Sequence, residues 1–163
     1  MTSEAPQAKL VFSYLKPEEI EFLNNYAMTE QYKAGTVIYQ KGQPASRAYL
    51  LLEGEVALRV PSKSGLDLLV EHAGPGTMFG ASVLLGENYM VTAQCLTDCK
   101  IMSIGKTPLE QIVEANPRMG LVIEKYLAEF YYHRSIDLMY KLEALIRGVP
   151  SEEELERQPV VIA

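Results

Sequence analysis

Short runs of β-branched and apolar residues, separated by turn residues, fill the middle of the chain from residue 36 to residue 105. The runs recur roughly every 8–12 residues, which is typical of antiparallel sandwiches and barrels with short connections. In RAYLLLEGEVALRV, two strand patterns flank Glu53–Gly54, and this arrangement predicts a hairpin. In TAQCLTDCKIMSIG, two strands are expected on either side of Thr97–Asp98. The pattern therefore predicts a mainly β domain.

Helical patterns flank this β region on both sides. The segment 17–27 begins with a proline, which suits the first turn of a helix, and 106–116 has an amphipathic pattern. A long helix is predicted over 117–147, because Asn116 suits its N-cap and Gly148 marks its end. At about 30 residues, this helix is much longer than the average helix of a globular protein.

The long helix carries more apolar residues than one core-facing stripe needs. One interpretation is that the whole apolar surface covers the β domain of the same chain. The other is that part of it packs against a second copy, since Leu138, Leu142 and Leu145 have the 4-then-3 spacing of a coiled-coil seam. The pattern alone leaves both interpretations open.

Composition excludes several classes of function. A chain of 163 residues suits one domain with a substantial core, and its formal net charge of −6 without a basic cluster argues against a nucleic-acid partner. The N-terminus has no basic segment before an apolar stretch, and no apolar run is long enough for a membrane span, so we expect a cytoplasmic protein. We find no nucleophile–base set and no carboxylate pair, so we do not expect an enzyme.

The cysteines and histidines do not indicate a metal site. Cys95 and Cys99 have a C-x3-C spacing, which fits neither a zinc knuckle nor a redox C-x-x-C motif, and we expect both to be small apolar core residues. His72 and His133 lie far apart in the sequence, without acidic or cysteine neighbours at ligand spacing. No metal site is therefore predicted.

Three segments together carry a family resemblance: YKAGTVIYQKGQPASRAYLLLEGEVAL, GPGTMFGASVLL and TAQCLTDCKIMSI. They resemble the cyclic nucleotide-binding domain of CRP/FNR-type bacterial regulators, protein kinase regulatory subunits and gated channels, over about residues 12–148. The resemblance implies an antiparallel β-jelly-roll (a double-stranded β-helix) with an N-terminal helix and a long C-terminal helix. We expect one such domain at 1–148, with its β-roll at about 30–105, followed by an acidic tail at 149–163. The glycines that fit this fold are Gly35, Gly42, Gly54, Gly74, Gly76 and Gly80.

In that family a phosphate-binding cassette holds the ligand. Its pattern runs roughly Phe-Gly-Glu-x-Ala-Leu-Leu, then a few residues, then Pro-Arg, two small residues and Thr or Ser. A short helix offers backbone N–H groups to the cyclic phosphate, and the Arg neutralises the phosphate charge. The Glu accepts the ribose 2′-hydroxyl, and the Thr or Ser contacts the phosphate or the base.

This chain departs from the pattern at both charged positions. In FGASVLLGENYMVTAQ, Ala81 stands where the family has Glu, and the Arg position falls on Tyr89 or Met90, depending on the direction of counting. Thr92 keeps the Thr position under the first of these counts only. Three residues are candidates to replace the missing charge: Arg59, and His133 and Arg134 of the long helix. The candidate ligand-binding residues are Phe79, Gly80, Ala81, Ser82, Tyr89, Met90, Thr92, His133 and Arg134.

Three hypotheses about function follow from this departure. The chain is a small-molecule sensor that does not bind cyclic AMP or cyclic GMP tightly, a degenerate domain that acts as a protein-interaction module, or a functional cyclic nucleotide-binding protein with compensating residues. Haem is an alternative ligand, which needs an axial residue such as His72, His133 or Cys95, and nothing in the sequence selects one.

The resemblance also bears on partners. It favours a homodimer through the long helix, with a candidate interface of Tyr126, Phe130, Leu138, Leu142 and Leu145. CRP/FNR-type regulators carry a helix-turn-helix domain after this helix. The acidic segment VPSEEELERQPVVIA cannot form a DNA-reading helix, so we expect no direct DNA binding if the chain ends there.

Overall fold

The computed structural model describes residues 14–65 and 67–148, and in this part of the chain it contains four helices and eight strands. The chain divides into two compact units between Leu127 and Ala128. The first unit holds all eight strands, three helices and the beginning of the long helix. The described part of the second unit is the remainder of that helix. The domain predicted at 1–148 includes residues of both units, and the division falls inside the predicted long helix.

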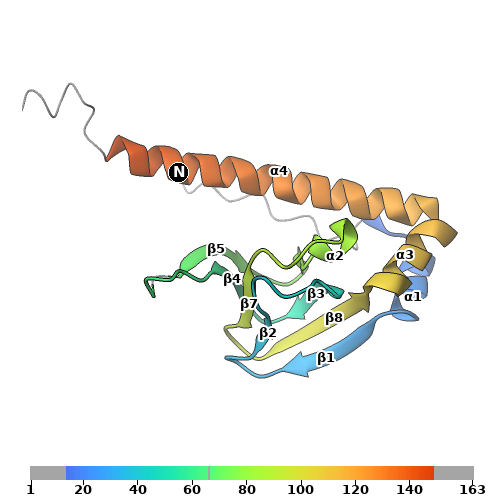
Figure 1. Cartoon of the computed structure of the whole chain (residues 1–163). Coiled ribbons are helices and arrows are strands. Elements are labelled where there is room, and N and C mark those ends of the chain that lie inside the picture. Colours follow the sequence, from blue (N-terminus) through green and yellow to red (C-terminus); the bar gives the residue numbers. More distant parts are fainter. Residues whose placement is uncertain (1–13, 66, 149–163) are drawn as a thin grey trace, which may run out of the picture. The chain divides into compact units, whose positions relative to one another are not determined.

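Two four-stranded antiparallel sheets form the β-roll (Figure 1). The first has the order β1-β8-β3-β6 and the second the order β2-β7-β4-β5. This arrangement confirms the predicted antiparallel jelly roll. The strands are β1 (Met28–Tyr32), β2 (Val37–Tyr39), β3 (Arg47–Glu53), β4 (Val56–Val60), β5 (Leu68–Ala73), β6 (Met78–Phe79), β7 (Thr92–Cys95) and β8 (Cys99–Gly105).

The predicted hairpin at Glu53–Gly54 is wrong, because β3 and β4 belong to different sheets. β4 instead forms its hairpin with β5. Gly54 lies at a corner where the chain passes between the sheets, with φ of +93°, and a Cβ atom there would lie 2.4 Å from the carbonyl oxygen of Asp98. Gly54 is therefore required because two corners of the chain approach each other closely. A hairpin turn also favours glycine, so the local sequence pattern does not distinguish a hairpin from a corner between sheets.

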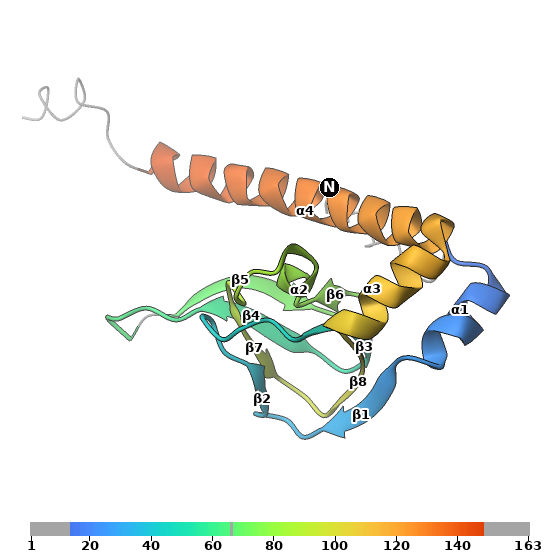
Figure 2. The same cartoon turned by 45° about the vertical axis from the view of Figure 1, so that its right-hand side comes forward.

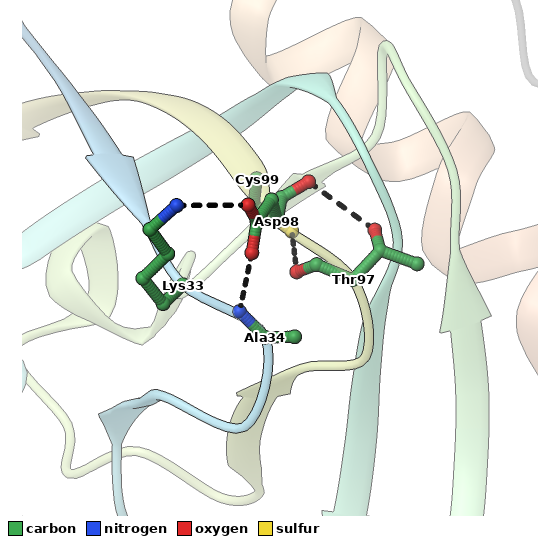
Figure 3. A network of polar contacts seen from close by, with 5 residues as sticks. All are labelled: Lys33, Ala34, Thr97, Asp98 and Cys99. Carbon is green, nitrogen blue, oxygen red and sulfur yellow. Dashed lines mark hydrogen bonds and ion pairs between the residues drawn. The ribbon is translucent and has the colours of Figure 1, made fainter.

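The second corner, between β7 and β8, is held by a polar network (Figure 3). One carboxylate oxygen of Asp98 accepts a hydrogen bond from the Ala34 N–H (2.9 Å), and the other pairs with Lys33 Nζ (3.1 Å). The Cys99 thiol donates to the carbonyl of Thr97 (3.3 Å). The break that the sequence predicts at Thr97–Asp98 is thus confirmed as the point where the chain changes sheets.

The helices begin close to the predicted positions. They are α1 (Pro17–Asn24), α2 (Ser82–Leu85), α3 (Lys106–Ala115) and α4 (Pro117–Arg147). The side chain of Asn116 accepts a hydrogen bond from the Met119 N–H (3.2 Å), which confirms the predicted N-cap of α4. α1 and α3 lie at the same end of the β-roll in both views (Figures 1 and 2).

The first unit has two apolar cores on opposite faces of the sheet β1-β8-β3-β6. The inner core lies between the two sheets, and Tyr49, Leu51 and Ile101 point into it. The outer core lies between this sheet and the helices, and Leu50 and Met102 point into it. The alternation of side chains along β3 and β8 assigns neighbouring residues to different cores.

The two parts of α4 differ sharply in burial. Met119 and Ile123 are buried in the outer core. Tyr126 is buried as well, and its hydroxyl donates to the carbonyl of Gly76 (3.1 Å), which leaves this candidate interface residue little surface for contact with a second copy. Large apolar side chains further along α4, including Leu138, Leu142 and Leu145, are exposed.

Candidate functional site

The segment between β6 and β7 forms the cassette that the sequence analysis singles out. Phe79 ends β6, and its ring stacks against Tyr49 with centroids 5.3 Å apart. Gly80 has φ of +75°, and a Cβ atom there would lie 3.0 Å from the Tyr49 ring and 3.1 Å from the carbonyl oxygen of Arg47. A side chain at position 80 is therefore disfavoured both by the backbone conformation and by the space available.

The short helix α2 follows directly. The Val83 and Leu84 N–H groups donate to the carbonyls of Gly80 (3.3 Å) and Ala81 (3.0 Å), so these two amides are engaged within the turn. The Ala81 side chain is buried in the outer core, while Ser82 is half-buried. A glutamate in place of Ala81 would lose much of its hydration, at a free-energy cost unless a new partner compensates.

The Tyr89 side chain is buried, with 3% of its surface exposed. Its hydroxyl accepts hydrogen bonds from the N–H groups of Ser46 (3.2 Å) and Arg47 (3.1 Å), and it donates to the carbonyl of Arg47 (2.9 Å). Its ring stacks on Tyr39, with the two centroids 3.8 Å apart. The Tyr89 hydroxyl thus hydrogen-bonds to three backbone groups, and the Tyr89 ring stacks on Tyr39.

The backbone of Tyr89 is tied to the same region of the chain. Its N–H donates to the carbonyl of Gln43 (2.9 Å), and its carbonyl accepts from the N–H of Gly42 (2.8 Å). Asn88 and Pro44 form an isolated antiparallel bridge beside these bonds. The cassette loop and the segment that leads into β3 are therefore held together by both backbone and side chain.

Phe79 shares the inner core with Tyr89, whereas Met90 and Thr92 lie outside it. Met90 is 67% exposed. The Thr92 hydroxyl accepts a hydrogen bond from the Lys41 N–H (3.0 Å). Along β7, Ala93 and Cys95 are buried in the inner core and Thr92 alternates with them, so Thr92 points to the opposite face of its sheet. Arg59 lies directly opposite Thr92 on β4 and shares that outer face.

His133 and Arg134 lie in the second unit and are described within it. His133 is exposed and its ring packs edge-on against Tyr132 (5.6 Å between centroids), while the Arg134 guanidinium lies 6.0 Å from the Phe130 ring centroid. Among the haem-ligand candidates, His72 pairs with Glu55 (3.2 Å), and burial raises the pKa of the Cys95 thiol to about 12. Within residues 14–65 and 67–148, no cluster of three or more His, Cys, Asp or Glu side chains could hold a metal ion.

Sequence reasoning missed the partners of Tyr89. Tyr39 and the backbone of Ser46–Arg47 lie more than forty residues away in the sequence, and only the fold brings them to the cassette. The pKa of Tyr49 is raised well above its usual value, first because of burial and second because of the neighbouring Tyr89 hydroxyl. The sequence carries one signal for such contacts, because it has 10 tyrosines and only 4 phenylalanines. A buried tyrosine hydroxyl usually has a hydrogen-bond partner.

A jelly roll with a glycine-led helix between β6 and β7, preceded by α1 and followed by a long helix, is the architecture that the family resemblance predicts. The family described as "Cyclic nucleotide-binding domain" matches residues 29–116, more than half of the chain. The chain therefore belongs to the cyclic nucleotide-binding domain family. None of the helices in the described ranges is long and apolar enough to cross a membrane.

Known regulators are similar to this chain over part of their length. The transcriptional regulator SdrP of Thermus thermophilus is 32% identical over 53% of this chain and 44% of its own length. The cAMP-activated global transcriptional regulator CRP of Pasteurella multocida is 22% identical over 67% of this chain and 53% of its own length. The crystal structure of the Thermus thermophilus catabolite activator protein has a TM-score of 0.71 at 23% identity, covering 83% of this chain and 63% of that one, and supports the fold. The chain thus spans about half the length of these curated relatives.

Proposed function

We propose that the chain is a non-catalytic, cytoplasmic regulatory module whose cassette is occupied by its own side chains and does not bind cyclic AMP or cyclic GMP tightly. The observation that carries this proposal is the Tyr89 hydroxyl, which binds three backbone groups of Ser46 and Arg47. Under one of the two alignments, the position of the family's phosphate-binding Arg holds this buried phenol. The proposal requires Tyr89 to stay in place under physiological conditions.

Charge supports the same conclusion. The cassette FGASVLLGENYMVTAQ contains one acidic side chain, Glu87, and no basic one. Truncating one partner of a buried charge pair costs about 2–5 kcal/mol, so a cyclic phosphate bound without an Arg would lose roughly 30-fold to several thousand-fold in affinity. Arg59 lies on the outer face of its sheet, which is a poor position from which to compensate.

Displacing Tyr89 to admit a ligand would have a further cost. The N–H groups of Ser46 and Arg47 would lose their acceptor, and Tyr39 would lose its stacking partner. An unsatisfied buried polar group costs about 1–3 kcal/mol. A ligand would have to replace these interactions in addition to making its own.

Calorimetric titration with cyclic AMP and cyclic GMP tests the proposal. We expect no saturable binding in the micromolar range for the wild type, and measurable binding for the double variant Ala81→Glu/Tyr89→Arg. The single variant Tyr89→Arg is the control. Because position 81 is buried, comparing it with the double variant shows what the new carboxylate costs. Wild-type dissociation constants in the low micromolar range or tighter would refute the proposal.

A second candidate function is supported by the exposed surface of α4. Leu138, Leu142 and Leu145 are 42%, 56% and 72% exposed, and their spacing fits a two-helix seam. With half-buried Phe130, they form the more exposed part of the candidate interface, to which buried Tyr126 also belongs. In this proposal the chain acts as a homodimeric interaction module.

Sedimentation at tens of micromolar tests the dimer. We expect a dimer for the wild type, a monomer for Leu142→Glu, and a dimer for the control Lys141→Glu, which changes the charge of an exposed residue next to the seam. A wild-type monomer at this concentration would contradict the homodimer.

A further inference from the structure

The two cysteines of the chain, Cys95 and Cys99, lie on either side of the corner between β7 and β8. Cys95 is the last residue of β7 and Cys99 the first of β8, and these strands belong to different sheets. Both side chains are buried in the inner core, which lies between the two sheets. The short connection therefore directs both thiols into the same space.

The contacts of the two side chains support this placement. Cys95 lies opposite Val56 in the ladder between β7 and β4, and the Cys99 thiol donates to the carbonyl of Glu55 (3.3 Å), the residue before Val56. Burial raises the pKa of the Cys95 thiol to about 12, and a hydrogen bond between the two cysteine side chains adds to this rise. The two sulfur atoms are thus neighbours, and both belong to free thiols.

Cys99 also borders a cleft at the surface. The cleft has a volume of about 170 Å³, and its charged lining residues are Lys33, Glu53, Asp98 and Lys100. Each lysine is paired with one of the two acids, and Figure 3 shows the pair of Lys33 and Asp98 beside Cys99. Because a water molecule occupies only about 30 Å³ in the liquid, a small uncharged oxidant fits into this cleft. The Cys99 sulfur is therefore the one that such an oxidant meets first.

We propose that Cys95 and Cys99 form a reversible disulfide when the chain is exposed to hydrogen peroxide. The Cys99 sulfur attacks one peroxide oxygen, the O–O bond breaks, and a sulfenic acid and one water are formed. The Cys95 sulfur then attacks the Cys99 sulfur, the S–O bond breaks, and the hydroxyl group leaves with the Cys95 proton as a second water. Two thiols are thus oxidised to one disulfide, while one hydrogen peroxide is reduced to two waters.

The disulfide changes the corner at which the two sheets join. The oxidised Cys99 sulfur has no proton to donate to the carbonyls of Glu55 and Thr97, which accept from it at 3.3 Å in the reduced chain. The Leu96 N–H donates to the same Glu55 carbonyl (2.8 Å), so its amide signal reports the change. Because burial keeps the Cys95 thiol protonated and the thiolate is the nucleophile, the pair responds to sustained oxidation rather than to a brief pulse. The proposal does not depend on whether the cassette binds a nucleotide.

Intact-mass measurement tests the disulfide. The folded wild type is treated with hydrogen peroxide, then unfolded and alkylated with iodoacetamide. We expect a single-chain species that has lost two hydrogen atoms and takes up no iodoacetamide, and dithiothreitol should restore both alkylation sites. Because the chain has two cysteines, this species can only contain the bond between Cys95 and Cys99. The amide signals of the oxidised chain should stay dispersed, with a shift at Leu96.

Two single variants test which thiol reacts first. In Cys95→Ser, the Cys99 sulfenic acid has no second thiol to react with, so dimedone should label Cys99. In Cys99→Ser, Cys95 does not line the cleft, and labelling should be lost. Equal labelling of the two variants would overturn the order of attack.

The wild-type measurement decides the proposal even if a variant fails to fold. The proposal is overturned if the folded wild type keeps two free thiols, or if it forms disulfides only between chains. It is also overturned if the disulfide appears only when the amide signals show that the chain has unfolded.

Discussion

Strands β3 and β8 separate two apolar cores, of which the inner one contains more buried aromatic side chains. On the inner face, Tyr49 stacks on Phe79, and Tyr39 stacks on Tyr89, whose hydroxyl is hydrogen-bonded to the backbone of Arg47. On the outer face, Leu50 and Met102 pack against helices and leave a hollow. A tyrosine ring with a hydrogen-bonded hydroxyl has a fixed position, whereas an unbranched thioether side chain adapts its shape. Alternation along two strands thus gives one sheet a face rich in aromatic side chains and a mainly aliphatic one.

The largest effect is expected from removing the inner-core ring. Tyr89→Ala should lower the free energy of unfolding by about 3–5 kcal/mol, because it leaves a cavity beside Tyr39 and removes the acceptor of two backbone N–H groups. Urea unfolding measures the change. Tyr89→Phe keeps the ring and should cost only about 1–3 kcal/mol, so equal losses for the two variants would contradict the role assigned to stacking.

A smaller loss is expected at the entrance to the cassette. Gly80→Ala should lower the free energy of unfolding by about 1–3 kcal/mol, because an L-residue is strained at φ of +75° and its methyl group would press on the Tyr49 ring. Gly35→Ala is the matched control, since Gly35 also has a positive φ but open space around it. Equal losses for both variants would show that backbone strain alone decides the effect.

The sequence predicted some parts of this comparison and not others. Asn116 and Gly148 located the ends of α4, because caps are local features of the chain. The hairpin expected at Gly54 was wrong, since a tight corner between sheets and a hairpin turn both favour glycine. Ala81 and Tyr89 were recognised as departures from the family pattern, but the partners of Tyr89 depend on contacts between distant segments. The hollow could not be predicted, because it arises from how side chains fit together.

The ion pair of Glu19 in α1 should make the stability of the fold depend on pH. Hydrogen bonds from Arg118 and from the Lys16 N–H hold the pKa of Glu19 below its ordinary value of 4.5. A carboxyl group whose pKa is lowered on folding stabilises the fold above that ordinary value, and this contribution is lost as the pH falls through the lower value of the folded state. Glu19→Gln should therefore reduce the loss of stability between pH 5 and pH 3, measured by urea unfolding. Because Arg118 is half-exposed, we expect an effect at neutral pH below that of Gly80→Ala.

The smallest effect is expected from filling the hollow. Ala48→Val adds two methyl groups where the outer core has space, so the free energy of unfolding should change by less than about 1 kcal/mol. The control Ala93→Val adds the same groups to the fully buried inner core and should cost about 1–3 kcal/mol. Similar costs at the two positions would remove the proposed difference between the two cores.

The most direct test of the central claim is a cyclic AMP titration followed by the backbone amide signals of Ser46 and Arg47. These two N–H groups donate to the Tyr89 hydroxyl, so they report whether the phenol stays in the cassette. If the cassette is closed by its own side chains, both signals should remain unchanged up to millimolar cyclic AMP. Saturable shifts of both signals at low micromolar cyclic AMP would show that the ligand displaces Tyr89 and would contradict this account.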